Sequence, residues 1–588
     1  MNKIEILDIL EKIIIEQKLE NFTNAQKPVT DSRHLEPNDI FICIEGFEID
    51  GHKFAKNAVE KGASLLITQR LLDLEIPQII VNNTRLAATL LCKQYYHNPT
   101  SKFKLIGITG TNGKTTTADL FYQALQKFGY KVGLIGTLGY KINDKLFPTE
   151  RTTPDIIELN EIFIKMIEAE IEYVVMEVSS HAIALNRIAS LEFDAGVFTN
   201  LTQDHLDFHN TIDEYANTKF KLFDLVKQNN GLAVINVDDE YGKLLYQKEH
   251  HKKIGISFDT GDLIIDNITS NIKGSKFTLS QNNQHHHFQT SLIGKYNLFN
   301  LTATISLIQQ LLPEIENDEM IKTVLDLQIV PGRLERANSK QDVGVYVDYA
   351  HSPDALENVL GALKKICQGR IICVFGAGGD RDKSKRPLML EAASQADLNI
   401  ITTDNPRSEN PADIIRDIIS QKEDCDDFWI IKDRKAALKT AISLAHPQDI
   451  VLIAGKGHET YQEINGTKHY FNDIEIAEAY CENNKEGLAV PIDALMLEII
   501  FEQKVNFENL LFEYISTDTR TIKPNSIFFA LNGDKFNGHH FTGTVTGPTG
   551  TISLTVGNWH HVVMVYDGSN ISSYVNGQFD ASIPKTGN

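Results

Sequence analysis

A glycine-rich loop between an apolar strand and a helix constrains this chain more than any other feature. The segment IGITGTNGKTTTADLFYQAL (106–125) has the strand–loop–helix order of a phosphate-binding loop. Backbone N–H groups of Gly110 to Thr116 can point at phosphate oxygens, and the helix N-terminus adds a positive dipole. Lys114 can bridge the terminal phosphates, and Thr115 can offer its hydroxyl to Mg²⁺. Because Ile108 stands where the full eight-residue pattern has glycine, the match is to the shorter GxxGK[ST] form.

Apolar strands alternate with helical stretches along most of the chain. This alternation is typical of α/β proteins whose parallel sheets are covered by helices. The composition changes near the end, where CENNKEG resembles a linker and the tail becomes rich in β-formers, Gly and Ser. We expect five segments: a small α/β domain (1–98), a central parallel-sheet domain with the phosphate loop (99–332), a third α/β domain (333–483), a partial α/β module (488–543), and a tail of short antiparallel strands (544–588).

Charge and composition exclude several classes of function. The formal net charge of -21 repels phosphate backbones and anionic membranes, so we expect no nucleic-acid or membrane partner. The acidic, amphipathic first 20 residues lack the features of a secretory signal, and we find no apolar run long enough to span a membrane. Six scattered cysteines without a CxxC pair indicate free thiols in a reducing cytoplasm. We expect a cytoplasmic monomer.

One module occurs twice. Residues 30–54 and 517–541 align without a gap and are identical at 11 of 25 positions. The separation is too long for a solenoid or a propeller blade. The repeat therefore indicates two related proteins fused head to tail, with the second one cut short.

An ordered set of motifs runs through most of the chain. The motifs are GTNGKTT (110–116), TTPD (152–155), MEVSSHA (176–182), TNLTQDHLDFH (199–209), GKYNLFN (294–300), VPGRLE (330–335), VDYAHSPDAL (347–356), GAGGDRDKSKRPLM (376–389), DNPRSE (404–409) and AGKGHETYQ (454–462). In this order they resemble the Mur ligase family over about residues 25–480, and most closely the ligases that add meso-diaminopimelate to UDP-N-acetylmuramoyl-L-alanyl-D-glutamate in peptidoglycan synthesis. The resemblance implies three domains: a small α/β N-terminal domain for the UDP-sugar, a central P-loop ATPase domain, and a C-terminal Rossmann-like α/β domain.

The family's chemistry explains these residue types. ATP phosphorylates the substrate's terminal carboxylate, the amino group of the incoming amino acid attacks the acyl phosphate, and phosphate leaves as the amide forms. Because negative charge builds at both steps, cations must be fixed nearby.

The resemblance implies four catalytic residues: Lys114, Glu177, His205 and Lys219. Glu177 and Thr115 would hold one Mg²⁺, and His205 would serve a second. Lys219 stands where the family carries a carbamylated lysine. A desolvated lysine has a lowered pKa, so its neutral amine can add CO₂ and become an anionic metal ligand. Periodicity alone would place Lys219 on a helix surface.

The remaining implied site residues form three groups. Those for ATP are Gly110, Thr111, Asn112, Gly113, Lys114, Thr115, Thr116, Asn300, Arg333 and Asp348, with Asn297 in the same asparagine pair. Those for the UDP-muramyl dipeptide are Ser32 at the uridine end and Thr152, Thr153, Ser179 and Arg187. Those for diaminopimelate are Arg381, Asp404, Asn405, Pro406, Arg407, Gly455 and Glu459.

Arg407 is the residue expected to decide which amino acid is added. meso-Diaminopimelate differs from lysine by one extra carboxylate, and an arginine offers a bidentate fork for such a group. Arg381 would lie nearby, and Asp404 and Glu459 would receive the ammonium.

The C-terminal segments resemble incomplete modules. Residues 488–543 resemble the first domain of the D-alanyl-D-alanine-adding Mur ligase, but no second phosphate loop follows. Residues 544–588 resemble part of a laminin-G or concanavalin-like sandwich, which usually needs about 100 residues to close. A truncated gene end is favoured here over a sugar-binding module, and we expect no D-Ala-D-Ala addition.

Two other functions stay open. One is a sister ligase that adds lysine, against which Arg407 argues. The other is a carbohydrate-binding or scaffold protein with a silent ligase, which would require damage at the phosphate loop, metal or lysine positions.

Overall fold

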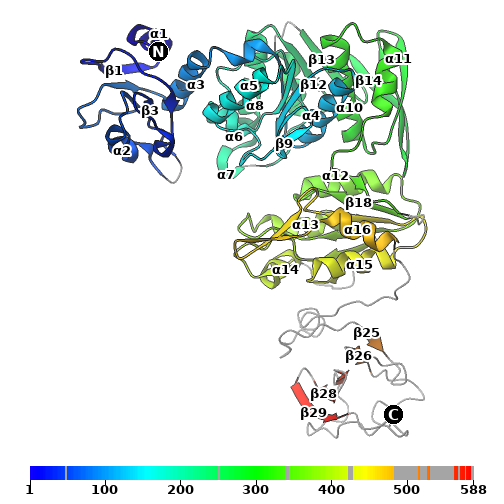
Figure 1. Cartoon of the computed structure of the whole chain (residues 1–588). Helices are drawn as coiled ribbons and strands as arrows, with labels where there is room; N and C mark the ends of the chain where they lie inside the picture. The colour runs from blue at the N-terminus through cyan, green and yellow to red at the C-terminus, as the bar shows by residue number, and fades with distance from the viewer. Residues whose placement is uncertain are drawn as a thin grey trace, which may run out of the picture. The chain divides into compact units, whose positions relative to one another are not determined.

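The computed structural model describes residues 1–46, 49–204, 206–248, 252–339, 343–421 and 428–482, followed by the separate strands 514–516, 526–529, 562–566, 570–575 and 578–584. The chain divides into two compact units, Met1–Val330 and Pro331–Asn588, each of which is described by itself (Figure 1). Within the described ranges, no helix combines the length and apolar character that crossing a membrane requires.

The first unit begins with a five-stranded sheet in the order β1-β5-β4-β3-β2. Only β1 runs antiparallel to its neighbour. The strands are β1 (Ile14–Lys18), β2 (Pro28–Val29), β3 (Ile40–Ile42), β4 (Leu65–Thr68) and β5 (Gln78–Val81). The helices are α1 (Lys3–Leu10), α2 (Ala55–Glu60) and α3 (Thr84–Tyr95), with short 3₁₀ turns η1 (Ser32–His34), η2 (Gly51–Phe54) and η3 (Pro99–Lys102).

An eleven-stranded sheet forms the rest of the first unit, in the order β16-β15-β14-β13-β12-β11-β6-β10-β7-β8-β9. The strands are β6 (Lys104–Thr109), β7 (Val132–Gly136), β8 (Gly139–Ile142), β9 (Lys145–Phe147), β10 (Tyr173–Glu177), β11 (Ala195–Phe198), β12 (Leu232–Asn236), β13 (Lys252–Ser257), β14 (Leu263–Asn271), β15 (Gly274–Gln281) and β16 (Gln284–Thr290). The helices are α4 (Lys114–Lys127), α5 (Ile156–Glu168), α6 (Ser180–Ala184), α7 (Leu206–His209), α8 (Ile212–Gln228), α9 (Glu240–Gln247), α10 (Lys295–Leu311) and α11 (Asn317–Leu325).

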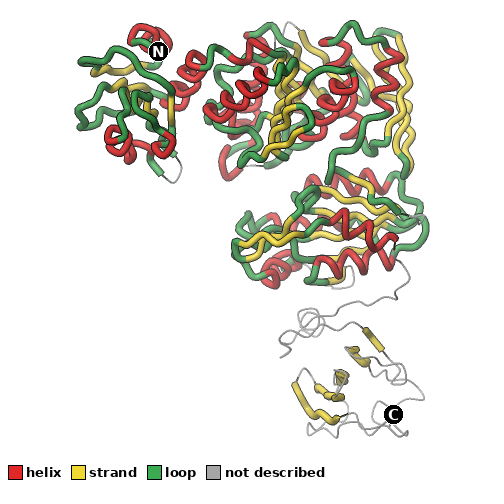
Figure 2. The backbone as a smooth tube through the Cα atoms, in the orientation of Figure 1, coloured by secondary structure: helices red, strands yellow, loops and turns green. Residues whose placement is uncertain are grey.

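Helices cover both faces of this large sheet (Figure 2). Successive residues of β10 enter different hydrophobic clusters, because side chains alternate across a strand. Val174 and Met176 pack in the cluster that contains Phe163 of α5, whereas Val175 packs in the cluster that contains Phe121 of α4. Strands that are buried on both faces are near-continuous apolar runs, which is why the sequence predicts them well.

The central strands of this sheet are parallel, as predicted, and antiparallel strands extend it at both edges. β7, β8 and β9 form antiparallel pairs, as do β14, β15 and β16. Asn282 and Asn283 both adopt positive φ, +49° and +64°, in the tight turn between β15 and β16, and Asn143 has a φ of +52° between β8 and β9. Tight turns of this kind join antiparallel strands, whereas parallel strands need a longer crossover.

The second unit contains a six-stranded sheet in the order β17-β18-β22-β19-β20-β21, parallel except for β17. Parallel strands that alternate with helices give this part of the chain the α/β fold expected for the third domain. The strands are β17 (Glu335–Arg336), β18 (Gly344–Asp348), β19 (Ile371–Phe375), β20 (Leu398–Ile401), β21 (Phe428–Ile430) and β22 (Ile450–Ala454), with a hairpin of β23 (Tyr461–Ile464) and β24 (Thr467–Tyr470). The helices are α12 (Pro353–Lys364), α13 (Lys385–Ala393), α14 (Pro411–Ile419), α15 (Arg434–Leu444) and α16 (Asp473–Glu482).

The C-terminal strands repeat one pairing of the N-terminal sheet. β25 (Tyr514–Ser516) and β26 (Ser526–Phe529) pair in parallel with Ile515 opposite Ile527. When the register of the repeat is extended by two residues toward the N-terminus, these residues align with Pro28 and Ile40, which lie opposite each other in β2 and β3. The next neighbour differs: β26 pairs antiparallel with β27 (Val562–Tyr566), which continues antiparallel into β28 (Asn570–Val575) and β29 (Gln578–Pro584).

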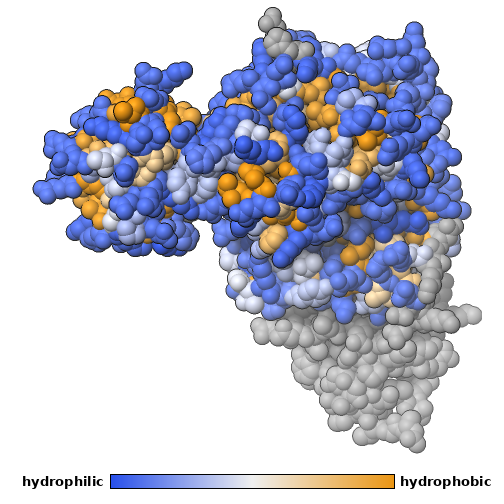
Figure 3. Space-filling view, turned by 45° about the horizontal axis from the view of Figure 1, so that its top comes forward, coloured by the Kyte–Doolittle hydropathy of each residue, from blue (hydrophilic) through white to orange (hydrophobic). Residues whose placement is uncertain are grey.

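The surface and the cysteines agree with the composition. Hydrophilic side chains cover most of the described face that Figure 3 shows. Five cysteines are free thiols, and all but Cys367 are buried: Cys43, Cys92, Cys367, Cys373 and Cys481. Cys425 lies outside the described residues.

Phe163 offers a test of the central core. Its ring is fully buried and lies 5.3 Å from the ring of Phe103, centroid to centroid. We expect Phe163→Ala to lower the free energy of unfolding of the first unit by about 3–5 kcal/mol, because the cavity left behind cannot fully collapse. Leu244→Ala, at a side chain that is 53% exposed, should cost less than about 0.5 kcal/mol. Urea unfolding followed by near-UV circular dichroism measures both; equal losses would contradict the core assignment.

Candidate functional site

The phosphate loop links the end of β6 to the start of α4. Gly110 and Gly113 have φ angles of +151° and +87°, which side-chain-bearing residues rarely adopt. There is also no room for a side chain at either position. A Cβ at Gly110 would lie 1.9 Å from Oγ1 of Thr199, and one at Gly113 would lie 2.7 Å from Oδ1 of Asn300. The loop must therefore carry glycine at both positions, and Asn300 of α10 lies against it.

Two loop amides do not point where the sequence predicts. The N–H of Thr111 donates to the Asn200 carbonyl and that of Asn112 to Asn200 Oδ1, both at 2.9 Å. The polar loop after β11 thus fixes the first half of the phosphate loop. The amides at the start of α4, including those of Thr115 and Thr116, lie in the first turn, where a helix leaves its N–H groups without intrahelical partners.

Two lysines reach the same carbonyl of this loop. Lys114 Nζ donates to the carbonyls of Gly110 and Thr111, each at 2.9 Å, and Lys219 Nζ donates to Gly110 at 2.8 Å. Lys219 is 1% exposed, so the structure corrects the surface position that periodicity alone favours. Burial, together with the nearby charge of Lys114, holds the pKa of Lys219 well below its ordinary value, although Asp204 opposes the shift. A neutral amine in this place is a nucleophile.

Helix α8 positions Lys219. The Thr211 hydroxyl accepts the N–H of Glu214 and begins the helix. Tyr215, Lys219 and Phe223 are spaced four residues apart and are all buried, so they share one helix face. The Lys219 ammonium lies 4.4 Å from the centre of the Tyr215 ring. The aromatic spacing on either side of this lysine is a sequence signal that could have shown its burial.

Glu177 ends β10 and faces the phosphate loop. Its carboxylate accepts hydrogen bonds from the Thr115 hydroxyl at 2.9 Å, the Thr137 N–H at 2.9 Å and the Thr137 hydroxyl at 3.1 Å. It is 2% exposed. Among the described residues, these three hydrogen-bond donors to the Glu177 carboxylate are all neutral groups. A buried carboxylate beside a threonine hydroxyl suits a hard divalent cation, which prefers oxygen ligands. His205 lies outside the described residues, and the sequence reading missed Thr137.

Four of the residues predicted for the dipeptide gather at the same end of β10. Thr153 donates to the Glu177 carbonyl at 2.8 Å and accepts the Ser179 N–H at 3.1 Å. Arg187 donates to the Thr153 carbonyl at 2.9 Å, and Thr152 lies 3.2 Å from Thr137, hydroxyl to hydroxyl. The fifth residue, Ser32, begins the 3₁₀ turn η1 after β2 and is buried; its carbonyl accepts a hydrogen bond from Lys61.

The second unit carries the other two residues predicted for the nucleotide. The Arg333 guanidinium lies over the Tyr349 ring at 4.7 Å. Asp348, at the end of β18, accepts the N–H groups of Leu334 and Ala350 at 2.6 and 2.8 Å. Burial raises the pKa of Asp348 to about 6, against the opposing effect of Arg333.

Six of the seven residues predicted for diaminopimelate follow β20 and β22, and Arg381 follows β19. A Cβ at Gly455 would lie 2.5 Å from Asp404 Oδ2, so only glycine fits there. Asn405 donates to Glu459 at 2.7 Å. Lys456, fully buried and missed by the sequence reading, donates to Asn405 Oδ1 and Glu459 Oε2 at 3.2 and 3.1 Å. The AGKGHE motif contained this lysine, but only the structure shows that it holds the two pocket residues together.

The predicted arginines approach a glycine turn. Arg407 donates to the Gly379 carbonyl, and a Cβ at Gly378 would lie 3.1 Å from Arg407 Nη1 and 3.7 Å from Cγ of Arg381. A Cβ at Gly379 would strike the Pro406 carbonyl at 1.9 Å. The turn after β19 and the DNPR segment after β20 are therefore interlocked.

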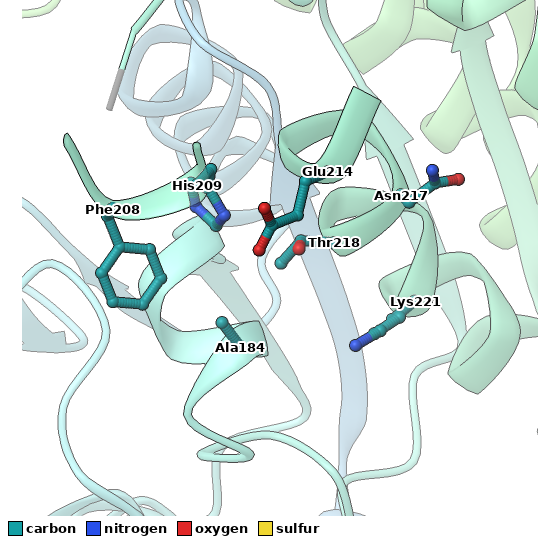
Figure 4. A pocket seen from close by; sticks show the side chains of 7 residues that line it. All are labelled: Ala184, Phe208, His209, Glu214, Asn217, Thr218 and Lys221. Carbon is teal, nitrogen blue, oxygen red and sulfur yellow. The ribbon is translucent and has the colours of Figure 1, made fainter. Parts of the chain in front are cut away.

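A cavity of about 580 Å³ opens beside α8 (Figure 4). The residues that line it come from α6, α7 and α8: Ala184, Phe208, His209, Glu214, Asn217, Thr218 and Lys221. Thr218 precedes Lys219 in the chain, so the cavity borders the helix that carries the buried lysine.

Comparisons with known proteins agree with this arrangement. The family model for the Mur ligase middle domain matches residues 108–308, that for the Mur ligase glutamate ligase domain matches 332–457, and that for the Mur ligase family catalytic domain matches 29–92. A model of the concanavalin A-like lectin/glucanases superfamily matches residues 507–588, a range that includes the whole second copy of the repeat.

The similar proteins are ligases. UDP-N-acetylmuramoyl-L-alanyl-D-glutamate--2,6-diaminopimelate ligase 1 of Clostridium acetobutylicum is 42% identical over 458 residues, which is 76% of this chain and 93% of that protein. The corresponding ligase of Caldanaerobacter subterraneus is 40% identical over 489 residues, 82% of this chain and 100% of that protein. A solved structure of such a ligase superposes with a TM-score of 0.61 at 30% identity, over 82% of this chain and 99% of that one. With these relatives and three matching family models, the chain belongs to the Mur ligase family.

Proposed function

We propose that this protein is an ATP-dependent amide ligase of the cytoplasm, acting as a monomer. It adds meso-diaminopimelate to UDP-N-acetylmuramoyl-L-alanyl-D-glutamate during peptidoglycan precursor synthesis. The observation that carries the proposal is the convergence of the phosphate loop, Glu177 and Lys219 within a chain about 40% identical to ligases named for this reaction.

The reaction has two steps. A carboxylate oxygen of the substrate attacks the γ-phosphorus of ATP, the bond to the β–γ bridging oxygen breaks, and ADP leaves. The amine nitrogen of diaminopimelate then attacks the acyl carbon, the carbon–oxygen bond to phosphate breaks, and the amine loses its proton as the amide forms. Lys114 and the first amides of α4 stabilise the transferring phosphoryl group, because they are fixed donors at the place where negative charge develops.

The Glu177 carboxylate and the Thr115 hydroxyl offer oxygen ligands of the kind that Mg²⁺ prefers. Thr115, Glu177, His205 and a carbamate on Lys219 are the residues that would hold metal. A bound Mg²⁺ neutralises phosphate charge. Carbamylation is consistent with the burial of Lys219: its neutral amine forms a bond to the carbon of CO₂ and releases a proton. The resulting anion would balance nearby positive charge.

The muramyl dipeptide binds along the end of β10. Thr152, Thr153, Ser179 and Arg187 hold its peptide portion near the phosphate loop, where its carboxylate can meet ATP. Ser32 holds the uridine end, as the family resemblance implies.

Arg407 favours diaminopimelate over lysine as the incoming amino acid. Its Nη1 lies 3.1 Å from the place that a Cβ at Gly378 would take, and Cγ of Arg381 lies 3.7 Å from the same place. Two arginines at one turn suit the extra carboxylate. Asp404, Asn405, Pro406, Gly455 and Glu459 complete the pocket, with the acids taking the ammonium. A lysine-adding ligase would gain nothing from two arginines there.

Residues 488–543 are proposed to be a partial copy of a Mur ligase N-terminal domain. The shared register of β2–β3 and β25–β26 supports this origin. The silent sugar-binding alternative is weakened by the intact Lys114, Glu177 and Lys219.

Phosphate release tests the proposed function directly. The full chain with ATP, Mg²⁺ and the UDP-muramyl dipeptide should release phosphate when meso-diaminopimelate is added, and much less with lysine or D-Ala-D-Ala. Amide product should appear by mass spectrometry in equal amount. Equal turnover with lysine would favour the sister ligase, and no turnover with any amino acid would favour the silent protein.

Lys219 is predicted to be essential. Lys219→Ala should lower kcat by about 100-fold or more, because the charge-stabilising group is lost. It should also abolish the carbamate signal that ¹³C NMR is expected to show for the wild type in ¹³C-bicarbonate. Lys227→Ala, at an exposed position of the same helix, is the control and should leave both unchanged. A wild-type spectrum without a carbamate signal would contradict the modification.

Arg407 is predicted to set selectivity. Arg407→Ala should reduce the preference for diaminopimelate over lysine, measured as the ratio of kcat/KM values, by at least about tenfold, because the second carboxylate loses its fork. The KM for ATP should stay unchanged. Arg407→Lys keeps the positive charge but loses the two-pronged guanidinium, so its preference ratio should lie between those of the wild type and Arg407→Ala. The assignment fails if the ratio is the same in all three proteins.

A further inference from the structure

A buried arginine outside the predicted pocket joins the two segments that carry the pocket's cations. Arg386 is the second residue of α13 and is 2% exposed. A fully charged guanidinium is costly to bury unless it is paired, so its partners show what it holds in place.

The strongest contact of Arg386 is with the DNPRSE segment. Its Nη1 and Nη2 donate to the two carboxylate oxygens of Glu409 at 3.0 and 2.7 Å, a bidentate pair. Nη2 also donates to the carbonyl of Gly378 at 3.3 Å. One guanidinium therefore contacts both the segment that carries Arg407 and the glycine turn that precedes Arg381.

Glu409 extends this link. Its carboxylate accepts the N–H of Asp380 at 2.6 Å, and the side chain of Asp380 accepts the Ser408 hydroxyl at 2.6 Å. The Arg386 hydrogen bonds lower the pKa of Glu409 to about 2, so it stays charged at neutral pH. The glycine turn and the DNPRSE segment are thus tied through both side chains and backbone.

Two residues beside this link have an unfavourable backbone conformation. Asp380 and Arg407 have φ angles of +53° and +50°, in the left-handed region that non-glycine residues seldom occupy. Such conformations persist only where the surroundings fix them. For Arg407, the backbone conformation determines where the guanidinium can reach.

We propose that the Arg386–Glu409 ion pair is a positioning brace for the amino-acid pocket. It holds Arg407 and Arg381 at the spacing that receives the second carboxylate of the incoming diamino acid. Arg386 and Glu409 touch no substrate in this account; they act through Arg407. The inference rests on the proposed function and adds to it two specificity-positioning residues.

A purely structural ion pair is the competing explanation, and Asp417 of α14 provides the matched control. It accepts from the same guanidinium, Nη1 to Oδ2 at 2.8 Å, but it belongs to neither pocket segment. Removing its charge disturbs the burial of Arg386 without releasing the DNPRSE segment. The brace predicts different effects for the two carboxylates, whereas a structural ion pair predicts similar ones.

The test compares Glu409→Gln and Asp417→Asn in the full chain, each measured beside the wild type. Glu409→Gln should raise the KM for diaminopimelate at least about tenfold, because a small misplacement of a binding group has a large kinetic effect. It should also narrow the preference over lysine, with the KM for ATP unchanged. Asp417→Asn should lower the unfolding temperature about as much as Glu409→Gln does. It should leave the KM for diaminopimelate near the wild-type value.

The result that would overturn the brace differs from the result that would overturn the proposed function. Equal changes in KM for both variants, or an unchanged preference over lysine in Glu409→Gln, would overturn the brace while the wild type still adds diaminopimelate. A wild type that shows no diaminopimelate-dependent phosphate release would overturn the proposed function, and the brace with it. As a conservative check, Arg386→Lys keeps the charge but loses the fork, so its KM for diaminopimelate should also rise.

Discussion

The convergence of two lysine side chains on the Gly110 carbonyl is the interaction on which the catalytic unit depends. Lys114 comes from the start of α4 and Lys219 from the middle of α8, and their ammonium groups donate to one oxygen at 2.9 and 2.8 Å. Burial disfavours a charged Lys219, and the nearby positive charge of Lys114 disfavours it further. The pKa of Lys219 is therefore lowered, which favours its neutral form. The same burial that makes Lys219 a poor ammonium makes it a good nucleophile.

The large sheet explains why these groups meet. β6 and β10 are neighbours in parallel register, with Glu177 opposite Ile108, so the phosphate loop and the Glu177 carboxylate leave the sheet at the same edge. Ligands of open α/β sheets bind outside the carboxyl ends of the strands for this reason. In the smaller sheet of the second unit, predicted site residues also follow the carboxyl ends of strands, because Asp404 comes after β20 and Gly455 after β22.

Sequence reasoning predicted what depends on local pattern and missed what depends on distant contacts. Buried strands such as β6 and β10 were predictable as apolar runs, and the phosphate loop as a strand–loop–helix motif. The antiparallel edge strands depend on tight asparagine turns, which the alternation of strands and helices does not reveal. The partner of the Thr111 and Asn112 amides, Asn200, could not be foreseen, because it follows a different strand. Lys219 was recognised only by resemblance, although its aromatic neighbours at four-residue spacing could have shown its burial.

In the proposed reaction a phosphoryl group is transferred to the substrate carboxylate before the amide forms. The most direct measurement uses UDP-muramyl dipeptide with ¹⁸O at both oxygens of its terminal carboxylate, followed by mass spectrometry of the released phosphate. Since the acyl-phosphate bond breaks between carbon and oxygen, each phosphate should carry one ¹⁸O from the labelled carboxylate. Released phosphate without the label, formed together with amide product, would contradict the account.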